Sequence, residues 1–94
     1  MLKHVVCFKL KEGESAEKAK EVLLSMKGNV PMIRDIEVGV DCLHSSRSYD
    51  VMLTVIVDDM NALNDYQEDP YHCGVVKKHM HAVRQSSVAI DYEI

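Results

Sequence analysis

Features of membrane-spanning, secreted and disulfide-bonded proteins are missing from the sequence. No apolar run approaches the length of a membrane-spanning helix, and the opening residues MLKHVVCFKLK are too short and too charged for a signal peptide. Cys7, Cys42 and Cys73 are odd in number and widely spaced, and they include no C-x-x-C pair. We therefore expect reduced thiols and a cytoplasmic protein that contacts no membrane.

The five histidines also lack the spacing of a metal site. His72, His79 and His81 share a predicted helix, but intervals of seven and two residues differ from the i, i+4 pair of a helical zinc site. A net charge of −4 argues against a nucleic-acid partner, and the pair Lys77 and Lys78 is typical of a solvated helix face. We expect no metal, no cofactor and no nucleic acid.

The composition is that of a globular protein, and 94 residues predict one domain spanning 1–94. There are no repeats, linkers or low-complexity tracts. Alternating apolar residues predict strands over 2–10, 36–42, 49–57 and 88–92, whereas helical spacing runs over 16–30 and 70–83, with a short helical segment before Tyr66. The order βαββαβ is the ferredoxin-like α+β arrangement, with 49–57 in the middle of the sheet because both of its faces are apolar.

The two faces of this sheet differ in apolar content. The richer set is expected under the helices: Val6, Phe8, Leu10, Val38, Val40, Val51, Leu53, Val55, Val88 and Ile90. The other face still carries Val5, Cys7, Met52, Ile56 and Ala89, which is much apolar surface for so small a domain. A second copy of the sheet is the simplest cover, so we predict a homodimer. The alternative is an ordinary half-polar face, because Lys3, Lys9, Glu37 and Asp41 share that side.

The candidate site lies in the stretch NALNDYQEDPYHCGV, from Asn61 to Val75. Asp69 is a good N-cap and Pro70 suits the first helical position, which puts His72 in the first turn. The positive end of the helix dipole disfavours an imidazolium, so His72 is expected to be neutral and able to accept a proton. Tyr66 lies across the turn and could supply a phenol. The alternative interpretation is a packing tyrosine beside a solvated histidine.

Five stretches resemble the stress-responsive A/B barrel (Dabb) family. They are HVVCFKLK from His4, VPMIRDIEVGVD from Val30, RSYDVML from Arg47, the pattern Leu63-x-x-Tyr66-x-x-x-Pro70-x-His72, and Asp91-Tyr92. The resemblance implies a dimeric α+β barrel. A plant polyketide cyclase of that family has its catalytic tyrosine and histidine at the positions of Tyr66 and His72, and a pocket histidine at His4. Leu23 and Asp69 stand where that cyclase has a tyrosine and a histidine.

Three functions follow as hypotheses, because most members of the family have no assigned activity. The first is an enzyme or binding protein for a small carbonyl compound, with His72 as general base and Tyr66 as hydrogen-bond donor. Its pocket would be lined by His4, Phe8, Leu23 and Leu53. The second is a non-catalytic stress-response or structural dimer, and the third a cofactor-free monooxygenase or isomerase. A cavity of a few hundred cubic ångströms beside His72 and Tyr66 would favour the first.

Overall fold

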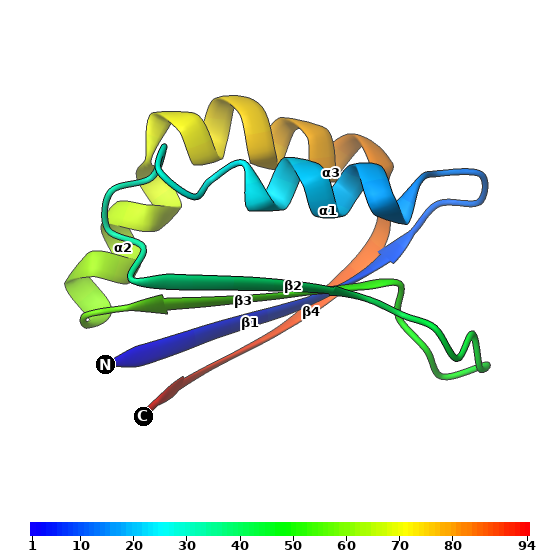
Figure 1. Ribbon diagram of the computed structural model, residues 1–94, viewed down its shortest axis with the longest axis horizontal. Helices are drawn as coiled ribbons and strands as arrows, with labels where there is room; N and C mark the ends of the chain where they lie inside the picture. The colour runs from blue at the N-terminus through cyan, green and yellow to red at the C-terminus, as the bar shows by residue number, and fades with distance from the viewer.

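The computed structural model describes residues 1–94, with four strands in one antiparallel sheet and the helices on one side of it (Figure 1). The strands are β1 (Leu2–Leu10), β2 (Asp35–Val40), β3 (Val51–Val57) and β4 (Arg84–Glu93), in the order β2-β3-β1-β4. The helices are α1 (Ala16–Leu24), α2 (Met60–Glu68), the π-helical segment η1 (His72–Lys77) and α3 (Lys78–Val83). The expected ferredoxin-like α+β fold is confirmed.

Strands β1 and β3 occupy the middle of the sheet, as the apolar character of both faces of β3 predicts. They pair antiparallel from Leu2 opposite Val57 to Phe8 opposite Val51. Side chains that face each other across such a pair lie on the same side of the sheet. His4, Phe8 and their partners on β3 therefore point toward the helices.

Helix α1 ends at Leu24, well before the expected end at Val30. The Ser25 hydroxyl donates to the carbonyl of Val22, and Gly28 adopts a positive φ of 83°, which turns the chain out of the helical path. Met26 and Val30 nevertheless lie in the core. Their apolar spacing reflects burial in the turns after α1, which explains why the sequence pattern overestimates the helix.

The core lies between the sheet and the helical layer. It comprises 17 buried apolar residues, which come from β1, β2 and β3, from the turn after α1, and from every helix. The fully buried members include Leu23, Met26, Val55, Tyr66 and Val76. None of the helices combines the length and the apolar content that crossing a membrane requires.

Strand β4 corrects the expected division of the sheet faces. Val88 pairs with Cys7, and Ile90 pairs with Val5, so both project away from the helices, where they are 52% and 61% exposed. Ala89 pairs with Val6 and lies on the helix-covered side instead. The prediction for these three residues is wrong because only the register of β4 with β1 decides which side each residue faces.

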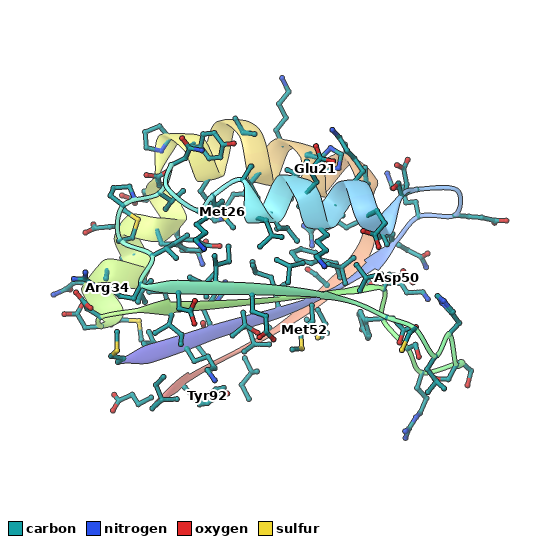
Figure 2. All side chains as sticks on the ribbon, in the orientation of Figure 1. Glu21, Met26, Arg34, Asp50, Met52 and Tyr92 are labelled. Carbon is teal, nitrogen blue, oxygen red and sulfur yellow. The ribbon has the colours of Figure 1, made fainter.

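The sheet face away from the helices, which we call the open face, is consequently more apolar than expected. Val88, Ile90 and Tyr92 of β4 join Met52 of β3 on it, and all four side chains are substantially exposed. Figure 2 shows Met52 and Tyr92 on the side of the sheet opposite the helices. Charged side chains also border this face: Lys3, Asp35 and Glu37. Apolar and charged side chains therefore share the open face, and its cover by a second copy stays a prediction.

Candidate functional site

A cavity of about 210 Å³ lies between the helical layer and the sheet. Six of its lining residues are those that the sequence singled out: His4, Phe8, Leu23, Leu53, Tyr66 and His72. Sequence reasoning missed the other eight: Val6, Gln67, Val76, Lys77, Met80, His81, Arg84 and Ser87. The fold thus brings all six candidates to one space, while their roles in binding or catalysis stay predictions.

His72 is held in place by the turn that precedes it. Its backbone N–H donates to the carboxylate of Asp69 at 3.0 Å, as expected for an N-cap. Its ring Nδ1 lies 2.8 Å from the carbonyl oxygen of Tyr66, which can only accept a hydrogen bond. Nδ1 therefore carries the proton of the neutral ring, and Nε2 keeps a free lone pair. This is the tautomer that a general base needs.

The His72 ring is also only 7% exposed, so the interpretation of a solvated surface histidine is wrong. Burial lowers the pKa of His72 and outweighs the hydrogen bond to the Tyr66 carbonyl, which acts in the opposite direction. The charges of Lys77 and His4 lower this pKa further. Removal from water is thus the main reason why the neutral form of the His72 imidazole is favoured, as expected. The helix dipole is not needed to explain it.

The helical run that follows His72 departs from the continuous α-helix that the sequence predicts. Residues His72–Lys77 form a π-helical segment, and regular α-helix resumes only at Lys78. Wider π-helical turns shift the side chains that follow, and such segments occur frequently at functional sites. Here Val76 and Lys77 both line the cavity. The prediction of a solvated helix face therefore holds for exposed Lys78 and is wrong for half-buried Lys77.

Tyr66 ends up wholly inside the protein, with its hydroxyl lacking any hydrogen-bond partner in the chain. Its ring stacks on His72 with centroids 4.2 Å apart, and meets the ring of His4 edge-on at 5.6 Å. Burial raises the pKa of the Tyr66 phenol, so the group keeps its proton and acts as a donor. A buried hydroxyl without a partner is costly and uncommon, and the one other such atom of this chain, Nε2 of His79, does not line the cavity.

His4 forms a pair with Asp91 of β4, a partner that sequence reasoning missed. The Nδ1–H of His4 donates to the Asp91 carboxylate, which leaves Nε2 free. The two residues face each other in the β1–β4 register. Pairing of the first and last strands, as in any ferredoxin-like sheet, is the signal that could have identified Asp91. The carboxylate fixes the orientation of the imidazole beside Tyr66.

Three basic side chains other than His4 and His72 line the cavity, whereas no carboxylate does. They are Lys77, His81 and Arg84. The Lys77 ammonium donates to the carbonyl of Gln67 at 3.1 Å, and the Arg84 guanidinium donates to the hydroxyl of Ser87 at 2.7 Å. Neither forms a salt bridge within the chain.

The chain's other reactive side chains do not gather at this site. Cys7, Cys42 and Cys73 are free thiols, and no three His, Cys, Asp or Glu side chains come together in a set that could hold a metal ion. The polar groups that border the cavity are therefore imidazole, phenol, amide, hydroxyl and cationic groups. Such a set suits proton transfer and the binding of oxygen atoms.

The pH dependence of stability should report the buried His72. Because its pKa is lowered on folding, the unfolded chain binds a proton more readily, so the folded state loses stability as the pH falls from about 6.5 through the lowered value. Denaturation at pH 7.5 and 5.5 should show a smaller loss for His72→Gln than for wild type. His81→Gln, which removes an exposed ring that forms no ion pair, is the control and should keep the wild-type slope. Equal slopes for wild type and His72→Gln would contradict this expectation.

The comparisons with known proteins agree with the fold. The stress-responsive A/B barrel domain family matches residues 2–94. A dimeric ferredoxin-like protein of unknown function from Bacteroides fragilis has a TM-score of 0.84 and 24% identity, over 99% of this chain and 95% of its own. A Dabb family protein from Mesorhizobium loti has a TM-score of 0.76 and 20% identity, over 99% of this chain and 95% of its own.

An enzyme is among the structures of similar fold. It is a hydroxynitrile lyase from Passiflora edulis, with a TM-score of 0.77 and 15% identity, over 99% of this chain and 92% of its own. Among curated proteins, no similar sequence was found. At these identities the structural likeness establishes the fold alone, whereas the family match covers nearly every residue. The chain belongs to the stress-responsive A/B barrel domain family.

Proposed function

We propose that this protein binds a small carbonyl-containing molecule in the cavity and moves a proton on it. The observation that carries the proposal is the pairing of two unused groups in one cavity. The Nε2 lone pair of His72 can accept a proton, and the Tyr66 hydroxyl, which has no partner in the chain, can donate a hydrogen bond. A base and a donor beside one apolar space are the elements of enolate chemistry.

In the proposed reaction, His72 Nε2 takes a proton from the carbon next to the carbonyl group. The electron pair of that C–H bond moves onto the carbonyl oxygen, and the Tyr66 hydroxyl stabilises the resulting negative charge. The carbonyl of Tyr66 holds the opposite ring nitrogen and favours the imidazolium that forms. His4, oriented by Asp91, supplies a second polar wall. Return of the proton to a different carbon would complete an isomerisation. If the enolate electron pair instead expels a leaving group from the neighbouring carbon, with the proton passing to that group, the outcome is a lyase reaction, and a hydroxynitrile lyase shares this fold.

We also infer a homodimer that buries the open face of the sheet. Apolar side chains from β1, β3 and β4 gather there, and a relative of similar fold is dimeric. The cavity opens on the helical side of the sheet, so association through the open face would leave it accessible. The free thiols and the acidic composition suit a cytoplasmic location.

The open face also supports a second candidate, a non-catalytic stress-response or structural dimer. In that case the sheet-to-sheet assembly would be the functional unit, and the cavity a packing defect. The two candidates differ in whether His72 and Tyr66 act on a ligand, which can be measured directly.

Exchange of protons with solvent tests the catalytic proposal. Purified protein incubated in D₂O with small ketones and keto acids should catalyse the replacement of the hydrogens next to the carbonyl by deuterium. NMR measures this replacement over time. His72→Ala should abolish this exchange. It should also weaken binding of any ligand found by thermal shift by about 1–3 kcal/mol, since a buried hydrogen-bonding group is lost. His44→Ala removes an exposed histidine that does not line the cavity and is the matched control.

Two outcomes would decide against catalysis. No exchange above the rate of the buffer alone across the ketone and keto acid series would leave the non-catalytic dimer. Exchange that persists in His72→Ala would remove His72 as the base.

A further inference from the structure

We propose that the ligand of this cavity carries a carboxylate next to its apolar, carbonyl-bearing body, and that Lys77 and Arg84 bind that carboxylate. This inference rests on the proposed function and names its substrate class. It follows from the charge, the origin and the bonding of the side chains that line the cavity.

The charge of the cavity lining is opposite to that of the whole chain. The protein has a net charge of −4, with 15 acidic and 11 basic residues, yet no Asp or Glu lines this cavity, whereas Lys77 and Arg84 both do. Cations with no acid among the lining residues produce a local positive potential that attracts anions. The nearest carboxylates, Asp91 on His4 and Asp69 on the backbone of His72, are already hydrogen-bonded and do not line the cavity, so neither one forms a salt bridge with Lys77 or Arg84.

Lys77 and Arg84 also have unused bonding capacity. Arg84 donates one guanidinium nitrogen to Ser87, and Lys77 donates to the Gln67 carbonyl, so each cation is positioned by a neutral neighbour that also borders the cavity. Arg34, by contrast, uses both ends of its guanidinium on Asp58. A guanidinium and an ammonium with free N–H groups are suited to the two oxygens of a carboxylate.

The two cations come from different elements and converge on one space. Lys77 ends the π-helical segment η1, and Arg84 opens β4, with the whole of α3 between them in sequence. Both side chains are half-buried. Both therefore line the same cavity as His72 and Tyr66.

The size and the walls of the cavity define the rest of the ligand. Apolar side chains form much of the lining: Val6, Phe8, Leu23, Leu53, Val76 and Met80. The volume of about 210 Å³ exceeds the roughly 150 Å³ cavity that accepts benzene in an engineered protein. A molecule with one ring or a short branched chain fits, with its acid group toward the cations and its carbonyl group toward His72 and Tyr66.

Matched probes can test the carboxylate assignment. Phenylpyruvate and phenylacetone share an aromatic body, a ketone and exchangeable hydrogens, but only phenylpyruvate carries a carboxylate. Calorimetric titration of wild type should show phenylpyruvate binding at least about tenfold more tightly, and the preference should fall as salt is added. Lys77→Met and Arg84→Gln should each lose most of that preference while binding phenylacetone as wild type does. Lys78→Met, an exposed neighbour outside the cavity, should keep the preference.

The outcomes separate this inference from the proposed function. Equal binding of the two probes, with solvent exchange still dependent on His72, would overturn the carboxylate assignment and leave the proposed function standing. Tighter binding of phenyl phosphate than of phenylpyruvate, lost in Lys77→Met, would replace the carboxylate by a phosphate. Failure of every probe to bind, together with no exchange on any ketone, would overturn the proposed function and this inference with it.

Discussion

Met52→Asp should convert the protein from a dimer to a monomer or prevent it from folding. Met52 lies in the centre of the open face, on the strand between β1 and β2, and the variant would place a carboxylate where a second sheet is inferred to pack. Taking an unpaired carboxylate out of water costs several kcal/mol, enough to abolish association at micromolar concentrations. Analytical ultracentrifugation of wild type and variant measures this directly.

Two neighbouring residues of β4 provide an internal control. Ile90→Asp should dissociate the dimer as Met52→Asp does, because Ile90 shares the open face, whereas Ala89→Asp places its charge on the opposite side. Met60→Asp, at the exposed start of α2, should leave association unchanged. A wild-type protein that sediments as a monomer at micromolar concentration would exclude the dimer and with it the non-catalytic candidate.

The parts of the fold that the sequence predicts well are those with local causes. Strand β1 spans residues 2–10 as expected, because its alternation is regular, and Asp69 caps the residues after it through a side chain only three positions away. The same local rules bring His72 and Tyr66 to one turn. His4 joins them because alternation along β1 fixes its side of the sheet.

The parts that the sequence does not predict depend on register and on distant partners. Alternation over 88–92 shows which residues share a face, but only the pairing with β1 reveals that Ile90 faces outward and that Asp91 faces His4. The π-helical segment continues the apolar spacing of the predicted helix 70–83, so the sequence pattern does not distinguish it and places Lys77 beside Lys78 in solvent. The sequence pattern places Arg84 in the break between the predicted helix 70–83 and the predicted strand 88–92. In the structure β4 begins at Arg84, and the side chain lines the cavity.

Two substitutions of Tyr66 separate its contribution to stability from its proposed contribution to catalysis. Tyr66→Ala should lower the free energy of unfolding by about 3–5 kcal/mol, because it removes a wholly buried ring from the core between His4 and His72. Tyr66→Phe keeps the ring and removes only the hydroxyl. Since that hydroxyl has no partner in the chain, its loss should leave the free energy of unfolding unchanged or raise it by roughly 1 kcal/mol.

The same Tyr66→Phe variant should lose most of the solvent-exchange activity. If the phenol stabilises negative charge on the carbonyl oxygen, removing that donor should slow exchange by about 10²–10³-fold, as expected when one such donor is lost. Urea denaturation and NMR exchange on the same preparations measure both quantities. A phenylalanine variant that exchanges at the wild-type rate would show that Tyr66 only packs. A variant that loses stability would mean that the hydroxyl has a partner in the folded protein, and the hydrogen bond assigned to the ligand would have to be withdrawn.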